Sequence, residues 1–290
     1  MVNKQGGVLV TPPPKLVQHL DWIEVTYPIL GNRPNVDYPE HWPKERVECK
    51  PHNGYAIAVR YADGRTEENH PDHPNMGIHV TLPAQTLQTL QEDDKWLLEF
   101  FIGSGGKITR LDCALDVFGN SLNFNRLWSL VRQKQYQCRL RKPPLREHDA
   151  ETGDTIYFGK MKSSVCTRIY NKAAEQNVTG EWTRVETMFR HSRANNAAKV
   201  MVKQNLECRA LIAGHVKIPR LKWWTDIMTI AATKTRLDRP TQSKRLEWLM
   251  NSVAPTLAKE VFLHGGEVER EFMLRYRDEL AKLEQMIDKI

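Results

Sequence analysis

Short runs in which apolar and polar residues alternate recur along this chain, and alternation with a period of two predicts β-strands. Segments with helical spacing interrupt these runs irregularly, unlike the regular strand–helix repetition of a parallel sheet. The sequence therefore predicts an α+β fold with a mainly antiparallel central sheet, interspersed helices and a helical C-terminal region. We expect one long helix over 83–103, a hairpin within 55–68, and strands at 21–27, 77–82, 107–119, 154–160, 165–172 and 182–190.

This pattern divides the 290 residues into three parts. Residues 1–18 are expected to form a short mobile leader, residues 19–215 the main α+β domain, and residues 216–290 the helical C-terminal region. A content of 40% apolar residues is enough to build a core in a chain of this length. No apolar run approaches the roughly 20 residues that cross a bilayer, and the N-terminus lacks the long apolar stretch of a secretory signal.

Charge and cysteine content indicate the setting in which the protein works. Lys and Arg number 42 against 35 Asp and Glu, a formal net charge of +7, which favours a polyanionic partner. The five cysteines are odd in number and never spaced as CxxC, so the sequence indicates neither a disulfide framework nor a zinc site. We therefore expect a protein of the reducing cytoplasm.

The run SSVCTRIYNK, residues 163–172, places one tyrosine between two cations. Because side chains alternate along a strand, Arg168, Tyr170 and Lys172 are expected to share one face, while Val165 and Ile169 share the other. Two interpretations stay open at this point. The tyrosine is either an aromatic packed beneath long basic side chains or a nucleophile that meets an anion.

The run ITRLDCALD carries two carboxylates on one strand face. Asp112 and Asp116 point to the same side as Arg110, with the small Ala114 between them. Positions four apart on a strand are separated by roughly 13 Å, which is too far for both to bind one metal ion directly. One is then a ligand and the other a positioning group, or the face is an ordinary solvated surface paired with Arg110.

A third run, WTRVETMFR, repeats this arrangement with Arg184 and Glu186 on one face and Val185 and Phe189 on the other. If the three strands pair with their polar faces in common, they form a carboxylate cluster able to hold Mg²⁺ or Mn²⁺ beside a tyrosine flanked by cations. Such a cluster suits phosphoryl transfer. The metal polarises the phosphate, the cations stabilise the transition state, and the phenol attacks phosphorus.

The ordered succession KITRLDCALDVFG, TIYFGKMKSSVCTRIYNKAAEQ and WTRVETMFR resembles the replication initiation factor family of rolling-circle plasmids, which also includes relaxases and filamentous-phage initiators. The upstream runs LDWIEVTY and MGIHVTLPAQTLQTL resemble it as well, so the similarity spans roughly residues 20–215. The resemblance implies a plasmid replication initiator whose main domain nicks DNA at the origin and transfers the strand through a 5′-phosphotyrosyl intermediate.

The same resemblance implies roles for individual residues. Tyr170 would be the nucleophile that becomes joined to the 5′ phosphate. The divalent cation, Mg²⁺ or Mn²⁺, would be held by Asp112, Asp116 and Glu186. The phosphate would be surrounded by Arg168, Lys172 and Arg184.

The resemblance also implies partners. These are origin DNA in double-stranded and single-stranded form, a host helicase, and a second copy of the chain, because closing the circle needs a second strand transfer. Tyr157 is a weak candidate for a second nucleophile within the chain. The C-terminal helix either contributes to the dimer contact or packs on its own chain through an apolar stripe of Val268, Phe272, Tyr276, Leu280, Leu283, Ile287 and Ile290.

Three other motifs carry weaker signals. His70 and His73 lie in a proline-rich segment that predicts a loop and not a metal-binding strand. The segment 132–148 concentrates basic residues around Tyr136, which suits phosphate contacts and base stacking or describes a plain basic loop. The tryptophan pair at 223–224 is expected to anchor a helix to the body.

Two alternative functions stay open. One is a relaxase of a mobile element, which performs the same nick in another context. The other is a DNA-binding regulator without chemistry, although no helix-turn-helix or zinc-finger spacing supports it directly.

Overall fold

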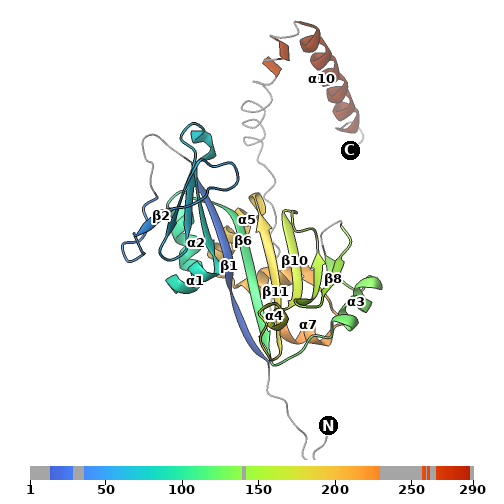
Figure 1. The fold of residues 1–290 in the computed structure, drawn as a ribbon. Coiled ribbons are helices and arrows are strands. Elements are labelled where there is room, and N and C mark those ends of the chain that lie inside the picture. Colours follow the sequence, from blue (N-terminus) through green and yellow to red (C-terminus); the bar gives the residue numbers. More distant parts are fainter. Residues whose placement is uncertain are drawn as a thin grey trace, which may run out of the picture. The chain divides into compact units, whose positions relative to one another are not determined.

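The computed structural model describes residues 14–28, 36–138, 142–228, 257–258, 260–261 and 266–287, with side chains up to residue 277 (Figure 1). The chain divides into two compact units, Met1–Leu237 and Asp238–Ile290. The first unit holds the central sheet, and the second contains one long helix, α10 (Gly266–Ile287).

A ten-stranded sheet organises the first unit, and its neighbouring strands are antiparallel (Figure 1). Across the sheet the strands follow the order β2-β3-β4-β5-β1-β6-β11-β10-β9-β8. Their bounds are β1 Lys15–Tyr27, β2 Arg46–Glu48, β3 Ile57–Tyr61, β4 Thr66–Asn69, β5 Ile78–Pro83, β6 Lys107–Phe118, β8 Leu145–Asp149, β9 Gly153–Phe158, β10 Val165–Asn171 and β11 Trp182–Arg190. The predicted α+β class and antiparallel sheet are confirmed.

Helices join these strands, and a two-stranded sheet of β7 (Gln137–Cys138) and β12 (Val216–Lys217) lies beside them. The helices of the first unit are α1 Ala84–Leu90, α2 Asp94–Gly103, α3 Phe124–Arg132, α4 Lys172–Glu175, α5 Ser192–Gln204, α6 Cys208–His215 and α7 Lys222–Ile227, with a 3₁₀ turn at Pro74–Met76.

One face of the sheet forms the core. Leu111, Cys113 and Leu115 on β6 are buried there, together with apolar residues of α2, α5 and α6, which pack against β6. The predicted alternation along β6 is thus correct, since burial of apolar surface drives these side chains to the helix-covered side. The opposite face carries Arg110, Asp112 and the other polar side chains of the central strands, and we call it the polar face.

The structure corrects two boundaries. The predicted helix over 83–103 is two helices, because Gln91 adopts a left-handed conformation (φ 53°) and Asp93 starts α2 by accepting hydrogen bonds from two backbone amides of its first turn. Strand β1 begins at Lys15, so residues 15–18 belong to the sheet and not to the leader. Residues 1–13 of that leader lie outside the described residues.

The end of the first unit is anchored by aromatic side chains. Trp223 and Trp224 on α7 are buried in the core, and the Trp223 indole donates a hydrogen bond to the carbonyl of Asn120 at 3.0 Å. The tryptophan pair therefore acts as the predicted anchor.

Helix α10 exposes several large apolar side chains. Phe272 and Tyr276 of the predicted stripe are 42% and 54% exposed, and Val268 is partly buried. The rest of the stripe, Leu280, Leu283, Ile287 and Ile290, lies outside the described side chains. Among the helices of the described segments, none has both the length and the apolar character that crossing a membrane demands.

Candidate active site

Tyr170 lies on β10 at the polar face. The residue is 3% exposed, and its hydroxyl donates a hydrogen bond to Oε2 of Glu186 on β11 at 3.3 Å. Arg168 donates to the same oxygen at 2.9 Å, and its guanidinium carbon stands 4.5 Å from the centre of the Tyr170 ring. Strand pairing produces this cluster, because Arg168 is opposite Glu186 in the antiparallel register.

The surroundings keep the phenol protonated. Burial raises the pKa of Tyr170 above its ordinary value, and the negative charge of Glu186 raises it further, while Arg168 and Arg184 act in the opposite direction. A neutral phenol is a weak nucleophile, so any attack through this oxygen needs a proton acceptor. Glu186 is in the right place, because it already accepts the hydrogen bond from the phenol.

Lys172 lies outside the strand that carries Tyr170. Strand β10 ends at Asn171, whose side chain caps the short helix α4 by accepting a backbone hydrogen bond at 3.1 Å. The prediction that Lys172 continues the strand alternation is therefore wrong, because the chain turns into a helix there. Its ammonium group still reaches the cluster, since Nζ is 5.7 Å from the centre of the Tyr170 ring and pairs with Glu175.

Asp116 is held by a dense set of donors. Nε and Nη2 of Arg184 donate to its two carboxylate oxygens at 2.7 and 2.8 Å, and the indole of Trp182 donates at 2.7 Å. This bidentate contact between Arg184 and Asp116 fixes the plane of the guanidinium group. In the antiparallel register Arg184 is opposite both Asp116 and Tyr170, so this pair sets the position of a cation beside the phenol.

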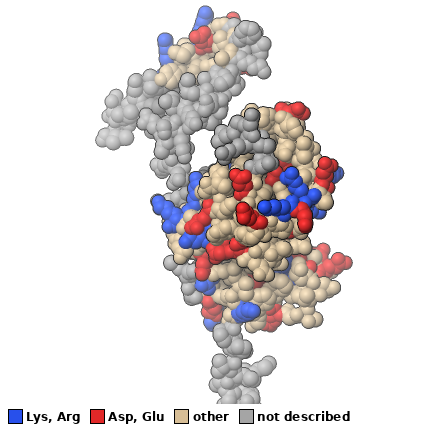
Figure 2. Space-filling model, turned by 90° about the vertical axis from the view of Figure 1, so that its left-hand side faces the viewer, with Lys and Arg blue, Asp and Glu red and all other residues tan. Residues whose placement is uncertain are grey.

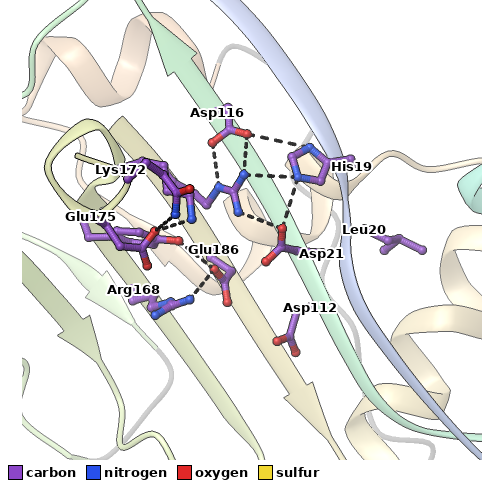
Figure 3. Close-up of polar contacts among 12 residues, drawn as sticks. His19, Leu20, Asp21, Asp112, Asp116, Arg168, Lys172, Glu175 and Glu186 are labelled. Carbon is purple, nitrogen blue, oxygen red and sulfur yellow. Dashed lines mark hydrogen bonds and ion pairs between the residues drawn. The ribbon is translucent and has the colours of Figure 1, made fainter. Parts of the chain in front are cut away.

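Strand β1 adds two residues to the same cluster, as Figure 3 shows. Nη1 of Arg184 donates to Asp21 at 2.8 Å, and Nη2 is 3.4 Å from Nε2 of His19. The same His19 nitrogen is 3.4 Å from Asp21. Burial alone would raise the pKa of Asp21, but His19 and Arg184 outweigh it, so the pKa of this carboxyl is lowered.

A β-bulge directs these β1 side chains. Leu20 pairs with Cys113 and Trp22 pairs with Asp112, so Asp21 is one extra residue on β1 opposite two consecutive residues of β6. The backbone amide of Leu20 donates at 2.9 Å to Asp94, a half-buried carboxylate at the start of α2. The helix on the core side therefore supports the irregular backbone that brings Asp21 to Arg184.

Asp112 has different surroundings, although it lies on the same strand and face as Asp116. Arg110 donates to it from Nε at 3.1 Å and from Nη2 at 2.6 Å, and Arg110 also pairs with Glu24 at 3.5 Å. Burial nevertheless raises the pKa of Asp112 to about 7, because the attraction of Arg110 does not offset the loss of water and the repulsion by Glu186.

The carboxylates on this part of the face fit a hard divalent cation. Asp112 and Glu186 are diagonal neighbours on adjacent strands, and the raised pKa of Asp112 marks a buried charge that its neighbours neutralise incompletely. Mg²⁺ commonly binds one or two carboxylates and completes its shell with water and substrate phosphate oxygens. In the portion of the chain that the structure describes, no three His, Cys, Asp or Glu side chains form a site made by protein alone.

Three residues of this cluster and its surroundings are not predicted from the sequence: His19, Asp21 and Glu24. His19 precedes the strand predicted at 21–27, and Asp21 gains its role from a bulge that alternation does not reveal. The available signal is the alternation upstream of the predicted strand, where the polar His19 and Asp21 flank the buried Leu20.

The other sequence motifs lie apart from this cluster, and one of them lies partly outside the described residues. Tyr136 packs edge-on against Phe158 with ring centres 5.5 Å apart, and Arg146 is paired with Asp154 at 2.7 Å. The arginines at 139 and 141 lie outside the described residues. The histidine-containing segment 69–75 is largely loop, as predicted.

Known proteins are similar to this chain in sequence and in fold. The profile of the replication initiation factor family matches residues 106–273, which include β6, β10 and β11. A protein of Bacillus subtilis (strain 168), named "Putative DNA relaxase NicK", is 27% identical over 99% of this chain and 93% of its own length.

A solved structure extends the comparison to the fold. The rolling circle replication initiator protein from Geobacillus stearothermophilus superposes with a TM-score of 0.59 at 20% sequence identity, covering 77% of this chain and 100% of that one. The family match takes in more than half of the chain and the three strands that carry the polar cluster. This chain belongs to the replication initiation factor family.

Proposed function

We propose that this protein nicks one strand of an origin DNA and remains joined to it through Tyr170. The observation that carries the proposal is the Tyr170 hydroxyl, hydrogen-bonded to Glu186 and lying beside two arginines on one sheet face. These groups supply a nucleophile, a proton acceptor and cations for the phosphate. The similarity to a protein named as a relaxase and membership of the family support the same chemistry.

The reaction would run in one displacement. As the Tyr170 oxygen attacks phosphorus, its proton passes to the Glu186 carboxylate. The bond from phosphorus to the 3′ oxygen breaks, and that oxygen takes up a proton to give a free 3′ hydroxyl. Arg168 and Arg184 would stabilise the extra negative charge of the transition state, and Lys172 would add a third cation close by.

A divalent cation, Mg²⁺ or Mn²⁺, would be held by Asp112 and Glu186 and would polarise the scissile phosphate. Asp116 suits a positioning role, because its bidentate pair with Arg184 holds that guanidinium group opposite Tyr170. Glu186 would then serve both as a metal ligand and as the acceptor of the phenolic proton.

Replacing Tyr170 tests the proposal directly. The Tyr170→Phe variant should lose nicking and covalent attachment while it keeps origin binding, because only the phenolic oxygen is removed. The measurement is a denaturing gel of a supercoiled plasmid bearing the cognate origin, incubated with Mg²⁺ or Mn²⁺ and then treated with protease.

A second tyrosine provides the matched control. Tyr157 lies on β9 opposite Arg168, so Tyr157→Phe removes a similar hydroxyl from the adjacent strand. It should nick as the unaltered protein does. Full nicking by Tyr170→Phe would place the nucleophile elsewhere. If the unaltered protein binds origin DNA but never cuts it, the result would favour a DNA-binding regulator without chemistry.

The initiator and the relaxase remain two candidate contexts for the same nick. The similarity to NicK over 99% of the chain favours the relaxase of a mobile element as the second candidate. Transfer of the nicked strand between cells, measured with and without the Tyr170→Phe change, separates a relaxase from an initiator that only replicates its plasmid.

Assembly and further partners are also proposals. We infer a homodimer, because closing a circle needs a second strand transfer and a second Tyr170 can provide it. The exposed Phe272 and Tyr276 on α10 offer apolar surface for that contact. Light scattering at rising concentration should show twice the monomer mass. A host helicase would be recruited to open the nicked duplex.

A further inference from the structure

A pocket of about 660 Å³ opens beside the candidate active site. It is formed by strands β1, β3, β4 and β5 with the start of α1, and its lining includes Trp22, Glu24, Thr66, Glu68, Gln85 and Thr86. Its volume lies within the range of roughly 300–1,000 Å³ that is typical of ligand sites. None of the roles proposed above uses it.

The pocket continues the polar face. Trp22 is opposite Asp112 in the register, and Glu24 is opposite Arg110, so both β1 residues stand on the side that carries the carboxylates proposed to bind metal. β1 is three strands from β10, and Trp22 lies four register positions along the strands from Tyr170. With a strand spacing of about 4.8 Å and a rise of about 3.3 Å per residue, the near end of the pocket is roughly 20 Å from Tyr170. A DNA strand bound at Tyr170 reaches this distance within a few nucleotides.

Acidic side chains make the pocket a poor site for phosphate. Glu24 and Glu68 line it, with Arg60 as a cation at its edge. Figure 2, which views the molecule from the side where β2 and α1 lie in Figure 1, shows acidic and basic residues intermixed there. Carboxylates instead accept hydrogen bonds from the exocyclic amino groups of nucleobases.

An aromatic platform stands at the end nearest the carboxylates. Trp22 is half-buried, its indole nitrogen donates to Glu24 at 2.9 Å, and the guanidinium carbon of Arg110 lies 4.5 Å from the ring centre. These two contacts hold the ring in place before any ligand arrives. A fixed indole is a suitable surface on which an unpaired base can stack.

A buried hydroxyl in the wall of the pocket lacks a hydrogen-bond partner. Thr86 has no exposed surface, it lines the pocket, and its Oγ1 has no hydrogen-bond partner among the described residues. Such groups are rare in folded proteins, because burying them without a partner costs free energy. The wall is also tightly built, since a Cβ added at Gly64 would stand 3.0 Å from this oxygen.

We propose that this pocket holds an unpaired nucleobase with an exocyclic amino group, a few nucleotides from the scissile phosphate. The base stacks on Trp22, and its amino group donates to Glu24 or Glu68. This inference rests on the proposed function and deepens it, because the pocket would recognise a base in the single-stranded part of the origin.

Homopolymer binding tests the pocket without any need for nicking. The probes are fluorescent oligo(dC), oligo(dA) and oligo(dT) of about 12 nucleotides, bound to the full chain carrying Tyr170→Phe. Thymine lacks an exocyclic amino group, so oligo(dC) or oligo(dA) should bind about tenfold more tightly than oligo(dT). Equal affinity for all three would overturn the proposal.

Pocket variants locate the preference. Trp22→Ala removes the stacking ring and Gln85→Ala shortens a side chain of the lining, so both should reduce the base preference. Gln88→Ala, on the same helix α1 as Gln85 but outside the lining, should leave the preference unchanged. Circular dichroism shows whether Trp22→Ala folds. If Trp22→Ala does not fold, Gln85→Ala still decides the test, because it alters only an exposed side chain. A preference that survives Gln85→Ala and a folded Trp22→Ala lies elsewhere, and the pocket assignment fails.

The two proposals fail in different ways. Loss of base preference with normal nicking would reject the pocket alone. A clear preference in a protein that never cuts the plasmid would support the pocket and reject the phosphotyrosyl mechanism.

Discussion

Asp112 and Asp116 stand four residues apart on one strand and one face, yet their surroundings differ. Around Asp116, Arg184 and Trp182 engage both carboxylate oxygens, and the same arginine bridges to Asp21. Around Asp112, Arg110 also binds with two nitrogens, but burial and Glu186 raise the pKa of the carboxyl to about 7.

The different surroundings suit the two aspartates to different roles within one cluster. At Asp116 both carboxylate oxygens accept short hydrogen bonds from Arg184, which suits holding a guanidinium group at a fixed place beside Tyr170. At Asp112 the negative charge is incompletely matched, which suits taking up another cation. We therefore propose that Asp116 positions Arg184 and that Asp112 binds the metal.

Removing Arg184 should have the largest effect. Arg184→Met leaves the buried Asp116 and the half-buried Asp21 without their cation. Breaking a buried ion pair in this way typically costs about 3–5 kcal/mol of unfolding free energy. Urea denaturation followed by circular dichroism measures it. Nicking should also fall, because the phosphate loses one of its cations.

Arg110→Met is the matched change at the other carboxylate. Its cost should be smaller near neutral pH, because Asp112 can take up a proton once its partner is gone. Arg184→Lys keeps the charge but loses the fork geometry and should lie between the two. Equal costs for Arg184→Met and Arg110→Met would show that the two carboxylates do not differ.

Metal titration of nicking separates the aspartates themselves. Asp112→Asn should raise the concentration of Mn²⁺ needed for half-maximal nicking about tenfold or more, because a proposed ligand is lost. Asp116→Asn should lower the maximal rate and leave that concentration nearly unchanged, because the change loosens Arg184. The opposite result would exchange the two roles.

The pH dependence sharpens the same test. Because Asp112 has a raised pKa, the native state holds a proton that the unfolded chain releases, so unfolding free energy should fall as pH rises from about 4 to about 7. Asp112→Asn should flatten that slope. Metal binding must displace the proton, so the unaltered protein should need more Mn²⁺ below about pH 7.

Much of the sheet was predictable because strand alternation is a local property. The buried Leu111 and Leu115 and the opposite-facing Asp112 and Asp116 follow from period two alone. The family resemblance then brought the three strands together, and the register places Tyr170 opposite Arg184 as that arrangement requires.

Other features depend on contacts that the sequence does not display. The end of β10 at Asn171 results from side-chain capping, which moves Lys172 off the strand. Beside the bulge at Asp21, the Leu20 amide donates to Asp94, which lies 74 positions further along the chain than Leu20. Long-range support of this kind leaves no periodic pattern, so alternation alone could not find Asp21.

The smallest expected effect concerns that support. In Asp94→Ala the buried amide of Leu20 loses its acceptor, which should lower the unfolding free energy by about 1 kcal/mol or somewhat more. Asp94→Asn keeps an acceptor oxygen and removes a carboxylate whose pKa burial raises, so its stability should stay close to that of the unaltered protein. Because the bulge aims Asp21 at Arg184, Asp94→Ala should also slow nicking at saturating DNA, and Asp94→Asn should restore the rate. Urea denaturation and the nicking rate together show whether Asp94 supports the bulge. A loss of stability with an unchanged nicking rate would mean that the bulge keeps its shape without Asp94.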